Sequence, residues 1–304
     1  MWIKAPRKVT DRIQLMGSEE NCVYLVEGKE AMIIGGSMSF LIPELEKQLE
    51  AINLDPARLK YQLIPHSHFD HCGAVPFFKR KFPGLVTLAS EVSKKVFAKE
   101  KVLRHIEEMN NLAVESMGLT DKYEPEIFRI DTIPVDRVVR EGDTIDLGDG
   151  ILVRIIEMPG HSKCSIASYI EAEKALFPSD AIPIPVDPEL RELLPMANDN
   201  FPSYLRSLEK ISSLDVEICC LCHRGAFTGD ECKRIVRDAL PVSQAYYRKI
   251  LDKYREFGNL EDTIEFFARE IVDKLNLSYI KMDLMRVVAK RMIGSVLEAE
   301  GENV

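Results

Sequence analysis

The chain has 304 residues, 46% of them hydrophobic and 29% charged, which is typical of a globular protein with a sizeable core. Its net charge is −9 and it has no long basic block, so we expect no nucleic-acid partner, because such partners need a clustered positive face. It has no long apolar run and no apolar leader at the N-terminus, so we expect no membrane span and no secretory signal. The seven scattered cysteines, an odd number, favour reduced thiols in a cytoplasmic protein.

The first third of the chain alternates two kinds of apolar spacing. Short runs rich in Val and Ile predict strands at 12–17, 22–28, 31–36, 61–65 and 86–90. Apolar residues three and four apart predict helices at 41–54 and 100–118.

A second strand-rich block follows. The turn signal Gly-Asp-Gly between two apolar runs predicts a hairpin at 143–160, and a second hairpin is expected at 164–180, turning near 171–174. A helix at 202–212 leads into an apolar run at 217–223. Strands with helices, repeated twice, predict an α/β fold of two sheets packed face to face with helices outside.

After about residue 229 only helical spacing remains. We predict a main domain at 1–228 and a helical C-terminal extension at 229–304, with the first helix of the extension broken at Pro241. The extension either caps the active site or forms a homodimer interface. Its aromatic residues either line an acyl or aromatic pocket or form plain core: Tyr246, Tyr247, Tyr254, Phe257, Phe266 and Phe267.

The sequence "HSHFDH" holds three of the six histidines of the chain. His66 and His68 lie two apart just after a predicted strand, so in extended geometry both side chains leave one face and can share a metal ion. Asp70 and His71 are adjacent where the chain turns toward a helix near Gly73, and they point elsewhere, toward a second ion. The competing interpretation is a polar turn, which would suit a lone histidine better than three at this spacing.

Further ligand types lie at other strand ends. His161 follows an apolar strand and a Pro-Gly turn, and Asp180 and His223 each end an apolar run. A sandwich presents such positions at one rim. His and Asp together suit Zn, Fe or Mn, so two divalent transition-metal ions are predicted. His105 lies within the helix at 100–118 without ligand-like neighbours, and we interpret it as structural or facing solvent.

Several cysteines lie near these residues. Cys72 and Cys164 flank the predicted ligands, and Cys72 stands near a helix start, where a thiol can be activated. We favour small buried residues packing under the site. A zinc ribbon at Cys219, Cys220 and Cys222 lacks a second Cys-x-x-Cys pair at ribbon spacing, so a buried strand is favoured there too.

His66-x-His68-x-Asp70-His71, followed by the other three strand-end residues, resembles the metallo-β-lactamase superfamily over about residues 10–228, in particular its dinuclear, glyoxalase II-type hydrolases. The resemblance implies an αββα sandwich. It also implies a ligand set in which one ion is bound by His66, His68 and His161, the other by Asp70, His71 and His223, and both by Asp180. Many relatives carry an Asp-Thr-Gly-like turn early in the chain, where this chain has "IIGGSMS" at 33–39.

Residues 61–91, the "GGSMS" turn and the helical tail are most similar to the quinolone-signal response thioesterases of pseudomonads, a group within the same superfamily. In that group the metals are iron and the pathway reaction is hydrolysis of an aroylacetyl-CoA thioester. The resemblance implies a thioester or ester hydrolase without naming its substrate.

The sequence therefore predicts a dinuclear metal-dependent hydrolase of a small, acyl-CoA-like thioester or ester. Two ions about 3.5–4 Å apart lower the pKa of a water between them to roughly 7, so that a metal-bridging hydroxide attacks the carbonyl. Asp70 is the candidate catalytic residue that orients this nucleophile. The alternatives are a phosphodiesterase or lactonase of the same superfamily, and a regulatory protein with a mainly structural metal site whose tail contacts a partner.

Overall fold

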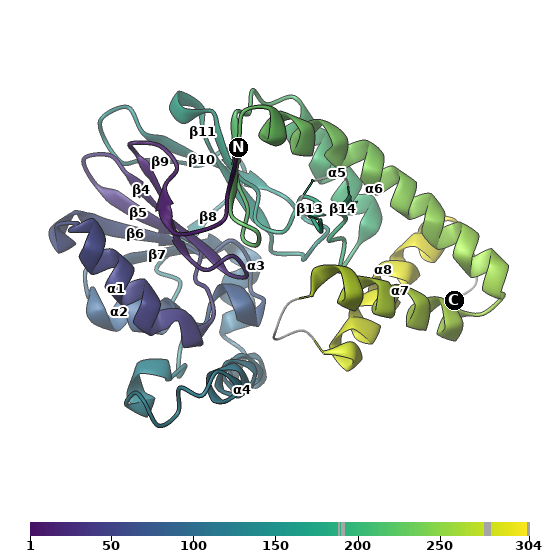
Figure 1. Cartoon of the computed structure of the whole chain (residues 1–304), viewed down its shortest axis with the longest axis horizontal. Coiled ribbons are helices and arrows are strands. Elements are labelled where there is room, and N and C mark those ends of the chain that lie inside the picture. Colours follow the sequence, from purple (N-terminus) through teal and green to yellow (C-terminus); the bar gives the residue numbers. More distant parts are fainter. Residues whose placement is uncertain (188, 190–191, 277–280, 303–304) are drawn as a thin grey trace.

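The computed structural model describes residues 1–187, 189, 192–276 and 281–302. Two seven-stranded sheets pack face to face, and helices cover their outer faces (Figure 1). This confirms the predicted αββα sandwich with C-terminal helices.

The first sheet contains the strands predicted in the first third of the chain. In spatial order they are β2 (Arg7–Lys8), β3 (Ile13–Gly17), β4 (Cys22–Glu27), β5 (Ala31–Ile34), β6 (Leu59–Leu63), β7 (Val86–Ser90) and β8 (Arg137–Val139). Strands β2 to β5 form an antiparallel meander, whereas β5 to β8 are parallel. The parallel strands require crossover helices, which cover the outer face of the sheet.

The second sheet contains both predicted hairpins. In spatial order its strands are β1 (Trp2–Ile3), β16 (Ala226–Thr228), β15 (Ile218–Cys220), β12 (Ala175–Phe177), β11 (Ile166–Ile170), β10 (Leu152–Glu157) and β9 (Thr144–Asp146). The first strand of the chain pairs with the last, Trp2 opposite Phe227. A separate two-stranded sheet joins β13 (Ile184–Pro185) and β14 (Leu193–Leu194).

Strand β4 shows why these strands read as almost continuous apolar runs. Tyr24 and Val26 point into the layer between the two sheets, whereas Val23 and Leu25 point outward into the layer under the helices. Both faces of the strand are therefore buried, so alternation between apolar and polar residues disappears.

The helices form two outer layers. Over the first sheet lie α1 (Ile42–Ile52), α2 (Val75–Lys81), α3 (Glu91–Phe97) and α4 (Glu100–Ser116). Over the second sheet lie α5 (Phe201–Ser212) and α6 (Asp230–Phe257), and α7 (Leu260–Leu275) and α8 (Met282–Ala299) pack on these two helices to the side of the sandwich (Figure 1). None of the described helices combines the length and apolarity needed to cross a membrane.

The predicted break at Pro241 is wrong, because α6 runs through this residue as one helix. Proline removes one N–H and thereby frees the carbonyl four residues earlier, at Arg237. Pro241 lies on the exposed side of α6, where water can satisfy the freed carbonyl. The packing of Ile235, Ala239 and Ile250 on the opposite side keeps the helix continuous.

The aromatic residues of the tail pack as core. Tyr246 stacks on Phe201 of α5, and its ring meets Phe267 edge-on at a centroid distance of 5.5 Å. Phe267 is fully buried and contacts Phe266, which in turn contacts Phe257. One continuous apolar cluster therefore joins α5 to α6, α7 and α8, and the division at residue 228 stays a prediction.

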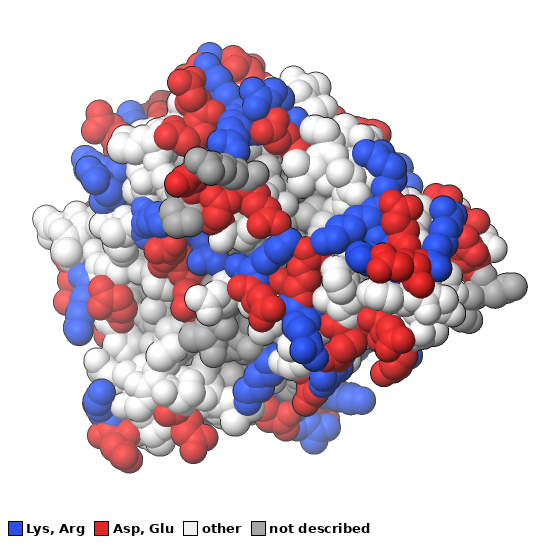
Figure 2. Space-filling view, turned by 45° about the vertical axis from the view of Figure 1, so that its right-hand side comes forward, with Lys and Arg blue, Asp and Glu red and all other residues white. Residues whose placement is uncertain are grey.

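The surface of this helical part carries charges of both signs. Figure 2 brings the helices forward, and on the face it shows Lys and Arg are interspersed with Asp and Glu. Glu270 of α7 illustrates the pairing: it accepts hydrogen bonds from Lys274 and, at 2.6 Å, from Lys249 of α6. Lys274 also reaches Glu192 at 2.6 Å. These pairs bind the helices to each other and to the segment after β13.

Candidate metal centre

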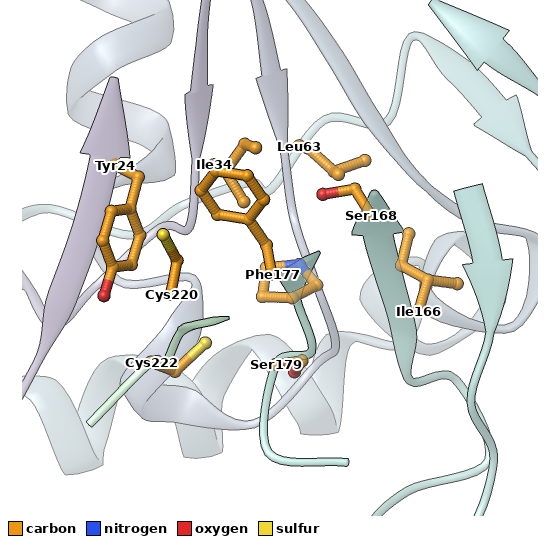
Figure 3. Close-up of a pocket in the computed structure, with 10 residues that line it drawn as sticks. Tyr24, Ile34, Leu63, Ile166, Ser168, Phe177, Ser179, Cys220 and Cys222 are labelled. Carbon is orange, nitrogen blue, oxygen red and sulfur yellow. The ribbon is translucent and has the colours of Figure 1, made fainter. Parts of the chain in front are cut away.

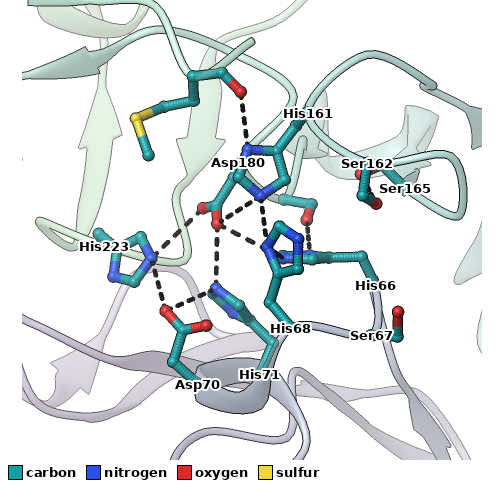
Figure 4. A network of polar contacts seen from close by, with 12 residues as sticks. His66, Ser67, His68, Asp70, His71, His161, Ser162, Ser165, Asp180 and His223 are labelled. Carbon is teal, nitrogen blue, oxygen red and sulfur yellow. Dashed lines mark hydrogen bonds and ion pairs between the residues drawn. The ribbon is translucent and has the colours of Figure 1, made fainter. Parts of the chain in front are cut away.

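The predicted ligands converge at one rim of the sandwich (Figure 4). His66 follows β6 of the first sheet, whereas His161, Asp180 and His223 follow β10, β12 and β15 of the second. The remaining three come from the segment directly after β6: His68, Asp70 and His71. The expectation that strand ends gather these side chains is met, and each sheet contributes part of the cluster.

The first group is His66, His68 and His161. His68 Nδ1 lies 3.1 Å from His66 Nε2 and 2.9 Å from His161 Nε2. Nitrogen atoms bound to one tetrahedral zinc ion at about 2.0–2.1 Å would stand about 3.3 Å apart. The three nitrogens are therefore close enough together to face a single ion.

The second group is Asp70, His71 and His223. Asp70 Oδ2 lies 3.3 Å from His71 Nε2 and 3.7 Å from His223 Nε2. Asp70 and His71 lie in a short 3-10 turn, Phe69–His71, and α2 begins only at Val75. This turn brings both side chains to His223, and the His71 ring also lies 4.3 Å from that of His66, so His71 adjoins both groups.

Asp180 lies between the two groups. Its Oδ2 is 3.0 Å from His71 Nε2 and 3.5 Å from His161 Nε2, and its Oδ1 is 3.5 Å from His223 Nε2. The preceding Ser179 takes a left-handed φ of 57°, which turns the chain at the end of β12. One carboxylate thus contacts histidines of both groups.

Contacts behind two of the histidines fix their tautomers. His161 Nδ1 donates to the carbonyl of Met196 at 2.7 Å, and His223 Nδ1 donates to the carbonyl of Glu20. A carbonyl only accepts, so these Nδ1 atoms carry the proton and the Nε2 lone pairs face the cluster. His66 Nδ1 lies 2.9 Å from Ser179 Oγ, a hydroxyl that can donate or accept, so this contact holds the ring without fixing its tautomer. Such outer contacts are typical of metal-binding histidines.

Charge within the cluster is unevenly distributed. Burial lowers the pKa of His66 and His161 and lowers that of His68 to about 3, so these imidazoles are neutral, as metal ligands must be. Burial also acts on His71 and His223, but Asp70 and Asp180 outweigh it and raise the pKa of both. The two carboxylates therefore attract positive charge into the second half of the cluster.

The residues fit a pair of metal ions. His71 Nε2 and Asp180 Oδ1 are among the buried side-chain atoms of the described residues that make no hydrogen bond of good geometry, although each lies within 3.5 Å of another member of the cluster. Buried polar atoms normally have one, so their orientation into the cluster calls for a further ligand. The donor set, imidazole nitrogen with carboxylate oxygen, suits Zn, Fe or Mn.

Access to the cluster is from the side of His68 and Asp70. Asp70 keeps 13% of its side chain exposed, whereas Asp180 keeps 3%. Behind the cluster, between the sheets, lies an enclosed cavity of about 10 Å³ that Tyr24, Phe177 and Ser179 help to line (Figure 3). Such a cavity has room for about one water. A substrate must therefore approach from the rim.

The "IIGGSMS" turn supports the ligand-bearing turn from below. A Cβ on Gly36 would lie 2.4 Å from the carbonyl oxygen of His71, so only glycine allows this approach. Gly73 N donates to Ser37 O at 2.7 Å. Asn110 of α4 is fully buried, donates to Phe69 O at 3.0 Å and accepts from Ser39 N at 2.7 Å. Sequence reasoning missed these supports, although the paired glycines were a visible signal.

The other histidine and the cysteines lie where they were expected. His105 is exposed on α4. Cys72 is fully buried and donates to His68 O at 3.2 Å, and burial raises its pKa. Cys164 Sγ lies 3.3 Å from Ser67 N and 3.2 Å from Ser162 Oγ. All the cysteines are free and buried.

The helical extension reaches the same rim. Arg224, next to His223, donates to the carbonyl of Leu275 at the C-terminal end of α7. In α8, Ser295 Oγ accepts from Phe201 N at 2.9 Å. The chain thus leaves the rim at β16 and returns to it at the end of α7.

Comparisons with known proteins agree with this geometry. The family model of the Metallo-beta-lactamase superfamily matches residues 16–223, which include every predicted ligand. A hydroxyacylglutathione hydrolase of Rhodopseudomonas palustris (strain BisB5) is 23% identical over 163 residues, 54% of this chain and 48% of that protein. The acyl-coenzyme A thioesterase MBLAC2 of Homo sapiens is 24% identical over 214 residues, 68% of this chain and 72% of that protein.

Solved structures show the same fold. A metallo-beta-lactamase family protein from Thermus thermophilus superposes with a TM-score of 0.65 at 18% identity, covering 99% of this chain and 93% of that one. The chain spans about half the length of the curated hydroxyacylglutathione hydrolases it matches. With a family match over most of its length and the ligand pattern at the expected rim, the chain belongs to the metallo-beta-lactamase superfamily.

Proposed function

We propose that the protein is a dinuclear metal-dependent hydrolase that cleaves a small thioester or ester. The observation that carries the proposal is Asp180, whose two oxygens reach histidines of both ligand groups. A single structural ion would need only one of these groups. Two groups joined by a carboxylate match the arrangement of two-metal hydrolytic sites.

Each residue has a part in this proposal. His66, His68 and His161 would bind one ion, Asp70, His71 and His223 the other, and Asp180 both. When bound, such ions polarise the substrate carbonyl and lower the pKa of a nearby water. Asp70 is the more exposed carboxylate, and in this proposal it would orient that water. No cysteine of the chain serves as nucleophile, because all are buried.

The substrate class rests on the relatives. Two of the matching proteins carry the names hydroxyacylglutathione hydrolase and acyl-coenzyme A thioesterase, and both names describe thioester cleavage. The resemblance to the quinolone-signal response thioesterases supports the same class. We therefore place acyl thioesters ahead of phosphodiesters and lactones, and we propose that α7 and α8 border the entrance of the site.

The test is a substrate screen on metal-replete protein. Acyl-CoA and acyl-glutathione thioesters, p-nitrophenyl esters, lactones and bis-p-nitrophenyl phosphate would be compared under identical conditions. We expect the highest kcat/KM on a thioester, its loss in His161→Ala, and its retention in His105→Ala, which removes an exposed histidine outside the cluster. Equal activity of the two variants, or a preference for the phosphodiester, would contradict the proposal.

A further inference from the structure

A groove of about 730 Å³ lies beside the loop that carries His161. This volume is within the range of about 300–1,000 Å³ that is usual for small-molecule sites. The groove is bounded by the loop, by the start of α5 and by α8, and its lining includes Lys163, Asn200, Ser203, Val287, Lys290 and Arg291. It shares no residue with the predicted ligand set.

The groove presents several positive charges in an acidic protein. Lys163, Lys290 and Arg291 are exposed, and none has an ion pair with a described carboxylate. Asp199 and Glu298 also line the groove, so three basic side chains face two acidic ones, in a chain whose net charge is −9. A local excess of positive charge on such a chain attracts anions to this place.

Side chains, not helix amides, would bind the anion. At the start of α5, Ser203 N already donates to Asn200 Oδ1 at 2.9 Å, and Phe201 N donates to Ser295 Oγ at 2.9 Å. The first turn of α5 therefore has few N–H groups left for a ligand. The guanidinium of Arg291 and the ammonium groups of Lys163 and Lys290 remain available to a ligand, and both kinds of group bind phosphate well.

Gly294 leaves the α8 side of the groove open. It lies in the interior of α8, where glycine is unfavourable relative to alanine. A Cβ built on Gly294 would meet no atom within 4 Å, so packing does not require glycine there. Because Gly294 has no side chain, the groove is open at this point and a ligand can approach the backbone of α8 closely.

We propose that this groove binds the phosphorylated nucleotide end of a coenzyme A thioester while the thioester carbonyl lies at the metal centre. The inference rests on the proposed function and names its substrate class. Lys163 is two residues from His161, so their Cα atoms are at most about 7 Å apart. The long flexible arm of coenzyme A would span the distance from the groove to the thioester carbonyl at the metal centre. Three separate cations match several phosphate groups better than the two carboxylates of a glutathione thioester.

The first experiment measures binding without catalysis. Calorimetry would titrate adenosine 3′,5′-bisphosphate, the nucleotide end alone, into the metal-loaded protein. We expect Lys290→Gln with Arg291→Gln to weaken binding by at least about tenfold, because hydrogen bonds to charged groups are lost. The matched control, Lys29→Gln with Lys60→Gln, removes two exposed lysines at the other end of the first sheet and leaves binding unchanged.

The second experiment uses Gly294→Leu, which fills the groove without touching the metal centre. We expect a folded protein by circular dichroism, a KM for acyl-CoA raised by at least about tenfold, and an unchanged kcat on p-nitrophenyl acetate, which has no carrier. A rise in KM for both substrates would mean that the groove does not bind the coenzyme A part of the substrate.

Failure of this inference and failure of the proposed function are separable. No binding of the nucleotide at millimolar concentration, or equal loss in the control variant, overturns the groove assignment. The assignment is also overturned if S-methylglutathione binds more tightly than the nucleotide and the same double variant abolishes this binding. The groove would then bind the carboxylates of a glutathione thioester. If the protein binds the nucleotide but hydrolyses no thioester, the groove assignment stands and only the proposed hydrolase function is overturned.

Discussion

Asp180 contacts histidines of both ligand groups, so its removal should act on both ions at once. Asp180→Ala should lower the metal content by about one ion per chain and hydrolysis by at least about 100-fold, because a shared carboxylate holds both ions in position. Plasma emission spectrometry and single-turnover kinetics measure the two effects. A variant with full metal content and full turnover would rule out this role, and His105→Ala serves as the unaffected control.

Gly36 supports the turn that carries His71 without binding anything itself. Gly36→Ala places a methyl group 2.4 Å from the His71 carbonyl, which should destabilise the fold by about 1–3 kcal/mol and weaken retention of one ion. Gly84→Ala is the matched control, because nothing lies within 4 Å of its Cβ. Urea unfolding and metal titration measure both quantities. Equal behaviour of the two variants would show that the turn tolerates displacement.

At the scale of residues the sequence predicts the candidate ligands and misses the residues that support them. His66, His68, Asp70 and His71 are recognisable by their spacing, and His161, Asp180 and His223 by their place after apolar strands. Gly36, Asn110 and the carbonyl of Met196 act through approaches between segments far apart in the chain, and no spacing rule predicts such approaches.

Among the elements, α6 and α7 are joined through Glu270. The Glu270 side chain is 11% exposed and accepts from Lys249 at 2.6 Å and from Lys274. Burial raises the pKa of this carboxyl, but the two lysines outweigh burial and lower it below 4.5. The stability that this shift provides is complete above the unfolded-state value and is lost as the pH falls through the lower folded-state value.

Glu270→Gln should therefore lower the free energy of unfolding by about 1–3 kcal/mol at neutral pH. The difference from the wild type should shrink as the pH falls below the ordinary value of 4.5. Glu256→Gln, which alters an exposed pair with Lys253, is the control and should change little. Guanidinium unfolding at a series of pH values measures the difference, and a constant difference across that range would contradict the assignment.

The helices also show where sequence patterns fail at the scale of elements. The period of the apolar residues predicts α1, α4 and α5 close to their observed bounds. The predicted break at Pro241 is wrong because packing on one face of α6 outweighs a local preference on the other. Whether aromatic residues form core or pocket depends on neighbours that only the folded chain supplies, here Phe201 of α5.

For the whole molecule, bound ions should be a major source of stability. The cluster gathers five imidazoles and two carboxylates from both sheets, and all of them except His68 and Asp70 are buried. Removing the ions with a chelator should lower the Tm by at least about 5 °C, and adding Zn, Fe or Mn back should restore it, because ligands that bind only the folded state stabilise it. Differential scanning calorimetry measures the effect. An unchanged Tm after removal of all metal would contradict an ion shared between the sheets.

Because the candidate ligands are divided between the two sheets, they are synthesised at different times. During synthesis, His66 to His71 emerge before His223, by about 8 to 30 seconds at about 5–20 residues per second. In that interval the nascent chain would expose only part of the proposed metal site, and an ion captured there would still exchange. The ion would be enclosed only when β15 joins the second sheet. For a chain that binds ions as proposed, metal identity is then decided by the cell's supply at the moment of folding, and protein made in media with different metals should retain different ions afterwards.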